Sequence, residues 1–198
     1  VMPSNLKVGL LNNVDLQFVI DPYVNVRTKA DDAGSDRVDG FGNIQLRLKI
    51  NLWGNEDGSP TAMALMPFVQ FPTADDEFGE TDHVTGGLIV PFKAELPAGF
   101  SLGLMGEIDI VRDDEDDDYA VELMHTAILG HDIVGDLAGY VEYIGIAPVD
   151  TGGGYQALAS AGLTYGLGEN AQLDGGVVVG ISDSAEDVRF FVGLSVRH

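Results

Sequence analysis

The sequence predicts an all-β protein, an antiparallel up-and-down transmembrane β-barrel of about twelve strands. Apolar and polar side chains alternate over segments of about ten residues, which is the pattern of strands with unlike environments on their two faces. Helical periodicity appears nowhere over a useful length, and no stretch approaches the roughly 18–20 apolar residues that a membrane helix needs. Short turns and longer polar connections also follow one another in turn, as in outer-membrane barrels.

The C-terminal stretch 161–198 shows the repeating unit most clearly. A tight turn at 168–170 and a longer acidic loop at 182–187 separate three strands. In the last strand, Val188, Phe190, Val192, Leu194 and Val196 share one face, and Arg189, Phe191, Gly193, Ser195 and Arg197 share the other. We expect the apolar face to meet lipid.

The N-terminal part repeats this unit. A short strand at 5–11 precedes Asn12-Asn13, a good tight-turn pair. Alternation continues through 14–27 and again through 41–53, where a long polar face argues against a half-buried strand of a soluble protein.

Eight further strands follow with less regular alternation. His125 falls on the apolar face of its strand, which predicts either a different register or a β-bulge. Pro67 and Pro91 lie inside predicted strands, where proline is unfavourable. The predicted ranges are 59–73, 83–97, 100–113, 119–133, 135–148, 154–168, 171–181 and 188–198.

Eleven strands are therefore visible in one predicted barrel domain, 1–198. Bacterial single-chain barrels usually have an even number, so we expect a twelfth strand that is short, distorted or missing before residue 5. The longer connections 28–40, 74–82, 114–118, 149–153 and 182–187 would face outside. We also expect the last strand to pair with residues near the start of the chain, with Arg189 and Arg197 pointing into the barrel.

The alternation predicts a set of charged side chains that point into the lumen. In a barrel of about twelve strands, they would either neutralise one another as a plug or line a thin polar path. The acids are Asp15, Asp21, Glu95, Glu107, Asp109, Glu122, Glu142 and Asp174, and the bases are Arg27, Arg47, Lys49, Lys93, Arg189 and Arg197.

More than half of the 32 acidic residues fall in the longer connections, and the net charge is −22. This charge argues against nucleic acid as a partner. Oxygen-rich runs such as 113–118 can bind Ca²⁺, with Asp114, Asp116 and Asp118 as weak candidates, but the run lacks the spacing of an EF-hand. A solvated acidic surface is the simpler interpretation, and no cofactor is predicted.

Nothing in the sequence predicts an enzyme. The four histidines, His83, His125, His131 and His198, belong to no recognisable triad or H-E-x-x-H pattern. The chain has no cysteine, which excludes disulfides and thiolate metal sites. Tyrosines and one tryptophan near strand ends, namely Trp53, Tyr119, Tyr143, Tyr155 and Tyr165, are expected to form partial interfacial girdles.

Several segments together resemble the outer-membrane barrel family described as "putative MetA-pathway of phenol degradation". They are LKVGLLNNVDLQF, GFGNIQLRLKINLW, MPFVQFPTADDEFG with Ala74 where glycine is common, GYVEYIG with the inward Glu142, and GLTYGLGENAQLDGGVVVGIS. The resemblance covers most of the chain and rests on the order and spacing of these motifs.

The resemblance implies a porin-like transporter of the bacterial outer membrane that passes small solutes passively. Hydrophobic or aromatic solutes are the class that the family name suggests. A plugged barrel that anchors a larger surface complex through its acidic loops is the first alternative, with protein partners on those loops. A soluble ligand-binding barrel is the second, and it predicts that Leu46, Leu48, Ile50, Val192 and Leu194 face an interior. Membrane lipid is the partner that the first two share.

Overall fold

The computed structural model describes residues 3–22, 24–30, 34–54, 56, 58–75, 83–113, 118–149 and 153–197. Nearly all of this part of the chain is β-structure, with one 3₁₀ turn, η1 (Pro97–Gly99). No helix in these ranges is long and apolar enough to cross a membrane.

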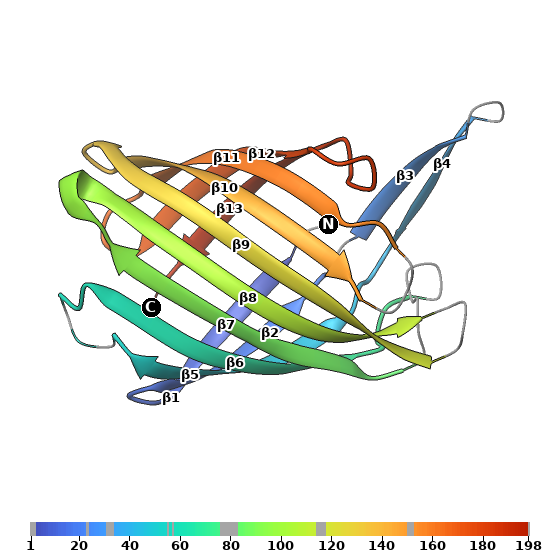
Figure 1. Ribbon diagram of the computed structural model, residues 1–198, viewed down its shortest axis with the longest axis horizontal. Helices are drawn as coiled ribbons and strands as arrows, with labels where there is room; N and C mark the ends of the chain where they lie inside the picture. The colour runs from blue at the N-terminus through green and yellow to red at the C-terminus, as the bar shows by residue number, and fades with distance from the viewer. Residues whose placement is uncertain are drawn as a thin grey trace.

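Eleven strands form one antiparallel sheet, which curls into a barrel-like shape with steeply tilted strands (Figure 1). Strands that follow one another in the sequence are neighbours in this sheet, except that β2 pairs directly with β5. The strands are β1 (Ser4–Leu11), β2 (Val14–Ile20), β5 (Ile44–Trp53), β6 (Thr61–Phe71), β7 (Thr85–Glu95), β8 (Phe100–Asp113), β9 (Asp118–Val134), β10 (Leu137–Pro148), β11 (Gln156–Gly166), β12 (Ala171–Gly180) and β13 (Val188–Val196). The predicted all-β up-and-down architecture is thereby confirmed, and Pro67 and Pro91 are accommodated inside β6 and β7.

The connections divide between two ends of the sheet, as the sequence predicts. The short turns β1–β2, β5–β6, β7–β8, β9–β10 and β11–β12 lie at one end, and the longer connections lie at the other (Figure 1). Positive φ angles occur only in short turns among the described residues, for example at Gly135 (φ 55°) and Gly168 (φ 77°). Glycine has no Cβ, so it adopts this backbone conformation without strain. We call the two ends the short-turn end and the long-connection end.

One predicted strand is wrong in its extent. Alternation suggests a single strand over 14–27, but β2 ends at Ile20, and Asp21-Pro22 begins a bend. The chain then forms a separate hairpin of β3 (Val24–Ala30) and β4 (Gly34–Gly40), which projects from the long-connection end (Figure 1). Arg27 therefore belongs to the hairpin and not to the barrel wall, which corrects its assignment to the lumen. Most of the predicted loop 28–40 is likewise hairpin.

β1 and β13 are the two edges of the eleven-stranded sheet. Each has one neighbour, β2 for β1 and β12 for β13. The expected pairing of the last strand with residues near the start of the chain is absent among the described residues. The structure thus supplies eleven of the roughly twelve predicted strands.

The two faces of the sheet differ as the alternation requires. In β8 and β9, Leu104, Ile108, Ile110, Leu123 and Leu129 are exposed on the outer, convex face. The residues between them are less accessible and point to the concave interior. The same outer face carries Val192 (85% exposed) and Leu194 (64%), opposite to the expectation for a soluble ligand-binding barrel.

Candidate functional site

Charged and aromatic side chains line up across the concave face of the sheet. Strand register places Gln17 opposite Arg47, Arg47 opposite Phe68, and Phe68 opposite Gly87. The same row continues through Gly87 to Asp109 and then to Glu122. Six neighbouring strands therefore bring one cation, one aromatic ring and two acids into one row that crosses the interior face. We call these residues the inner row.

Arg47 is the cation of the inner row. Its Nε donates a hydrogen bond to Oε1 of Gln45, and its guanidinium carbon lies 6.0 Å from the centre of the Phe68 ring. That distance is within the range of a cation–π interaction. Arg47 also interacts electrostatically with Glu107 and Asp109. Gln45 on the same strand, β5, therefore holds the Arg47 side chain, which interacts with acids on β8.

Two acids on β8 oppose Arg47, and a third lies beside them on β9. Glu107 and Asp109 alternate along β8 and interact electrostatically with one another. Asp109 faces Glu122 on β9. Oδ1 of Asp109 is buried without a hydrogen-bond partner in the described part of the structure. A Cβ added to Gly87 would lie 2.6 Å from this oxygen, so the glycine leaves the space that the carboxylate occupies.

A second row of inward residues, closer to the short-turn end, carries fewer charges. Lys93 lies opposite Gly103, Gly103 opposite Ile128, and Ile128 opposite Glu142. Glu142 interacts with Thr126 on β9. Lys93 also forms an exposed ion pair with Glu95, with 2.7 Å between Nζ and Oε1. A hollow of about 260 Å³ opens near these residues, towards the short-turn end.

Other predicted lumen residues have local partners. Asp15 forms an ion pair with Lys7 on β1 at 3.0 Å and lies opposite Lys49 on β5. The carboxylate of Asp174 covers Gly193. A Cβ added to Gly193 would lie 2.6 Å from Oδ2 of Asp174. Asp21 lies at the bend after β2, where partial burial raises the pKa of its carboxyl.

Two predicted lumen bases lie at opposite ends of β13. Arg189 pairs with Glu186 of the preceding connection, at 3.3 Å between Nη2 and Oε1. Arg197 follows the last residue of β13 and donates a hydrogen bond to the backbone oxygen of Glu169, at 3.4 Å. Arg197 thus contacts the short turn after β11, where its backbone N–H also donates a hydrogen bond to the oxygen of Asn170, at 2.8 Å.

The interior also holds apolar side chains that an inventory of charges alone misses. Met66 and Ile89 are almost fully buried, and so are Leu158 and Val178. Alternation in the sequence already indicates that they point inward. Met66 is two residues from the inward Phe68, and Ile89 is two residues from the inward Gly87. The interior is therefore amphipathic and partly filled.

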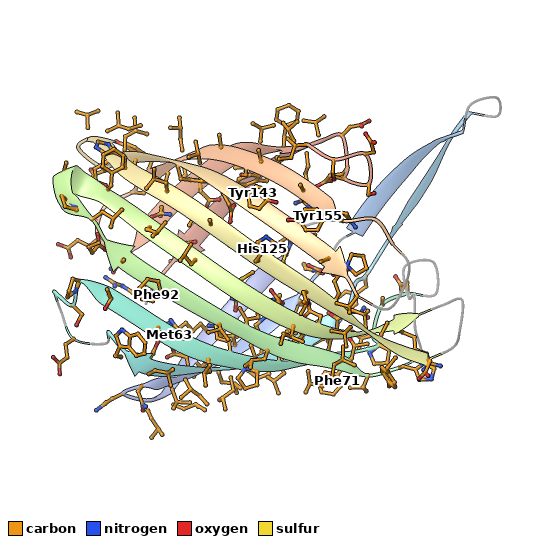
Figure 2. The ribbon with its side chains drawn as sticks, viewed as in Figure 1. Met63, Phe71, Phe92, His125, Tyr143 and Tyr155 are labelled. Atoms are coloured by element: carbon orange, nitrogen blue, oxygen red, sulfur yellow. The ribbon has the colours of Figure 1, made fainter. Side chains whose placement is uncertain are left out.

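Aromatic side chains gather near both ends of the outer face. Trp53, Phe100 and Tyr165 are exposed near the short-turn end. Tyr119, Phe71 and Tyr155 are exposed near the long-connection end, and Tyr143 is exposed midway along β10 (Figure 2 labels Phe71, Tyr143 and Tyr155). Aromatic rings at two levels, with aliphatic side chains between them, are typical of membrane barrels.

His125 points outward within one of these groups, without a change of register or a bulge. Its Nε2 lies 3.3 Å from the hydroxyl of Tyr155, and that hydroxyl lies 2.5 Å from the hydroxyl of Tyr143. His125 and Tyr155 cover Gly145, where a Cβ would meet both side chains. Figure 2 shows His125, Tyr143 and Tyr155 as one group. The polar histidine is accommodated on this face because two tyrosines surround it.

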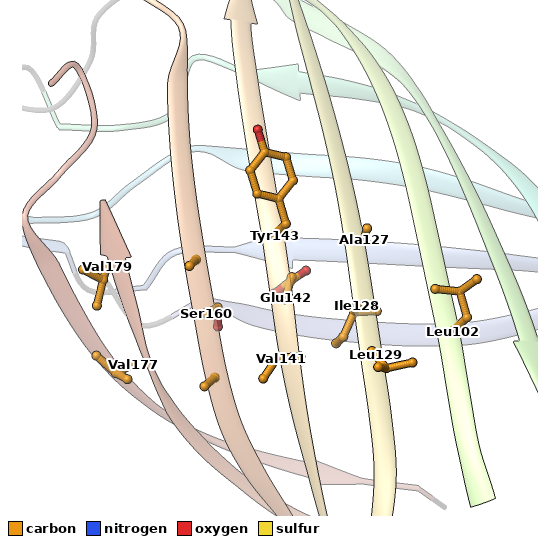
Figure 3. A pocket seen from close by; sticks show the side chains of 12 residues that line it. Leu102, Ala127, Ile128, Leu129, Val141, Glu142, Tyr143, Ser160, Val177 and Val179 are labelled. Atoms are coloured by element: carbon orange, nitrogen blue, oxygen red, sulfur yellow. The ribbon is translucent and has the colours of Figure 1, made fainter. Parts of the chain in front are cut away.

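The outer face between the aromatic levels is shallowly grooved. A groove of about 540 Å³ runs over β8 to β12, lined by Leu129, Val141, Tyr143 and Val179 among others (Figure 3). It carries little besides aliphatic side chains, which fits contact with lipid tails.

The calcium candidates Asp114 and Asp116 lie outside the described residues, and Asp118 is the exposed first residue of β9. Within the described ranges, no group of three or more histidine, cysteine or acidic side chains is placed to hold a metal ion.

Comparisons with known proteins agree with this architecture. No curated protein matches the chain. The family model described as "Putative MetA-pathway of phenol degradation" matches residues 3–198. This match covers almost the whole chain, and the chain therefore belongs to that family.

Proposed function

We propose that the protein is a barrel of the bacterial outer membrane through which small solutes pass passively. The observation that carries this proposal is the inverted arrangement of the two faces. Ile108, Val141 and Leu163 are half-exposed or more on the outer face, while Glu107 and Glu142 point inward. In water this arrangement would expose apolar surface without compensation, whereas lipid would cover it. The family membership and the two aromatic levels support the same conclusion.

The interior supports passage of small amphipathic solutes. Arg47 and the opposing acids would orient polar groups of a solute, since fixed charges filter what a narrow path admits. Phe68, Met66 and Ile89 beside them offer apolar contacts. Hydrophobic or aromatic solutes with one polar group fit this mixture, which agrees with the class that the family description names.

Reconstitution tests the proposal. The purified protein is inserted into planar bilayers for conductance, and into liposomes for uptake of small aromatic and sugar solutes. We expect conductance, and faster entry of aromatic solutes than of sugars of similar size. Absence of both conductance and solute flux, from protein shown to be folded in the bilayer, would contradict it.

Arg47→Gln is the lumen variant for this assay, and Leu163→Ile is its matched control on the outer face. The first should change conductance or the preference among solutes, and the second should change neither.

A surface-assembly role is the second candidate, and the β3–β4 hairpin is the observation that favours it. The hairpin extends away from the barrel (Figure 1), and its base is closed by a hydrogen bond from Gly42 N to Asp21 O at 2.8 Å. Replacing 23–41 by a short glycine linker should leave the barrel and its conductance intact. If the hairpin holds a partner, that partner should co-purify with the intact chain and be lost from the deletion.

A further inference from the structure

Among the described residues, the two edge strands leave main-chain groups on one side without a strand partner. β1 is exposed along its whole length, and all but two residues of β13 are exposed. Inside a bilayer, unpaired backbone N–H and C=O groups cost several kcal/mol each, and lipid-exposed sheet edges do not occur. In the membrane location proposed above, both edges must therefore be covered.

The direction of the two edges decides what can cover them. All ten neighbouring pairs of the sheet are antiparallel, so the first and the eleventh strand run the same way, towards the short-turn end. Direct pairing of β1 with β13 would be parallel and would break the pattern of the sheet. One added strand, running the opposite way, would be antiparallel to both.

A second copy of this chain does not supply such a strand. Two copies inserted with the same orientation present edges that all run towards the short-turn end. Every other strand of the eleven-stranded sheet already has two neighbours. Contacts between copies would again be parallel pairs.

We propose that one extended polypeptide strand, running from the short-turn end to the long-connection end, pairs with β1 on one side and β13 on the other. It closes a twelve-stranded barrel and needs about ten residues. Its outward side chains are apolar, because they lie beside Leu6 and Val8 on β1 and beside Val192 and Leu194 on β13. Its inward side chains are small or polar, because their neighbours include Lys7, Gly193 and Ser195.

Cysteine cross-linking of the full protein, assembled in the outer membrane, tests this seam, and the chain has no cysteine of its own. Each of Leu6→Cys, Val8→Cys and Leu10→Cys is combined with Val192→Cys or Leu194→Cys, so that an unknown register does not decide the result. Every pair is treated first with an oxidant and then, separately, with a bismaleimide of matching span. One intervening strand separates two Cα atoms by about 10 Å, beyond the reach of a disulfide.

Two control pairs calibrate the experiment. Gly175→Cys with Val192→Cys joins adjacent strands, since a Cβ at Gly175 would lie 3.8 Å from Cγ2 of Val192. This pair should form a disulfide. Leu163→Cys with Val192→Cys spans one intervening strand, β12, and should react only with the bismaleimide.

We expect at least one seam pair to behave like the second control and none like the first. An intramolecular disulfide would mean direct closure, a cross-linked dimer would mean pairing with a second copy, and no reaction with either reagent would mean that no single strand bridges the edges. Each of these three results overturns the proposal. Recovery of the protein in the outer-membrane fraction is scored separately, so failure of the proposed location is distinguishable from failure of the seam.

Discussion

The central wall of the barrel and its last strand have the same alternating pattern but very different surroundings. In β8 and β9, the outward residues Leu104, Leu123 and Leu129 are 42%, 39% and 39% exposed. In β13, the outward residues Phe190 and Val192 are about as accessible as they would be in an unfolded chain, at 79% and 85%. Alternation therefore sets which face a side chain occupies, whereas neighbours on both edges set how deeply it is buried.

The charged residues of the two regions differ in the same way. In the central wall, strand register brings Arg47 towards acids that are about 60 residues away in the sequence. At the edge, Arg189 pairs with Glu186, three residues before it, and Arg197 contacts the backbone of Glu169 in the β11–β12 turn. Long-range charge arrangements thus depend on continuous pairing, which the edge lacks.

The largest expected effect comes from placing a charge on the outer face. Ile108→Arg should destabilise the inserted barrel by about 2–4 kcal/mol, the cost of arginine near the middle of a bilayer. Val192→Arg should lower the stability of the inserted barrel by a similar amount if β13 also lies in the bilayer. This variant compares the edge strand with the central wall. Thr126→Arg is the inward control, and the nearby Glu142 should reduce its cost. Unfolding in denaturant, in liposomes, measures all three, and equal costs on both faces would contradict the assignment of faces.

Glycines of the two regions should respond differently to alanine. At Gly87, a Cβ would lie 2.3 Å from the backbone oxygen of Ile108, which cannot move without disturbing the strand pairing. At Gly193, the nearest atoms belong to the Asp174 side chain, which can rotate away. Gly87→Ala should therefore cost about 1–3 kcal/mol, and Gly193→Ala clearly less. Denaturant midpoints give the difference, and a larger loss at Gly193 would show that the edge is as tightly constrained as the wall.

Removing an inner-row charge should change ion preference more than removing an edge charge. Arg47→Gln leaves the opposing acids without their cation, and should raise the preference for cations by on the order of 1 kcal/mol, or about fivefold. Arg189→Gln should have a smaller effect, because Arg189 is 59% exposed and lies beside Glu186. Reversal potentials in a salt gradient measure the ratio. Equal shifts from the two variants would mean that the inner row does not form the narrow part of the path.

The smallest expected effect concerns the outer aromatic groups. Tyr143→Phe removes the hydroxyl that lies 2.5 Å from that of Tyr155 and should cost about 0.5–1.5 kcal/mol. Tyr165→Phe, at the other end, is the matched control and should cost less, because its hydroxyl contacts no protein group in the described ranges. Thermal unfolding in detergent resolves the two, and equal shifts would mean that the hydroxyl pair contributes nothing.

Much of the fold could be predicted from the sequence, because a period of two is a local property that each strand carries by itself. It identifies the strands and their faces, and thereby the inward direction of Glu107 and Glu142. It does not say which segments pair. Residues 24–27 keep the alternation of β2, yet they pair with 37–40, since the bend at Asp21-Pro22 interrupts the wall.

The candidate site could be predicted only in part for the same reason. Parity indicates that Arg47 and Asp109 point inward, but their place in one row depends on the register of three strand pairs. The outward His125 is explained only by Tyr143 and Tyr155, which two other segments contribute. Arg197 contacts Glu169 because the pairing of β12 with β13 brings the β11–β12 turn beside it, and alternation does not show that pairing.

Alternating accessibility along β9 tests the central claim most directly. Single cysteines are introduced at each position from 122 to 130 in the cysteine-free chain, and the protein is inserted into liposomes. Each is then treated with a water-soluble thiol reagent, or labelled with a fluorophore and exposed to a lipid-soluble quencher. We predict that the odd positions, such as Leu123 and Leu129, are quenched from the lipid and unreactive towards the water-soluble reagent. The even positions, such as Glu122 and Thr126, should react from water. The reverse pattern, or no alternation at all, would contradict a barrel that meets lipid on its outside and solutes on its inside.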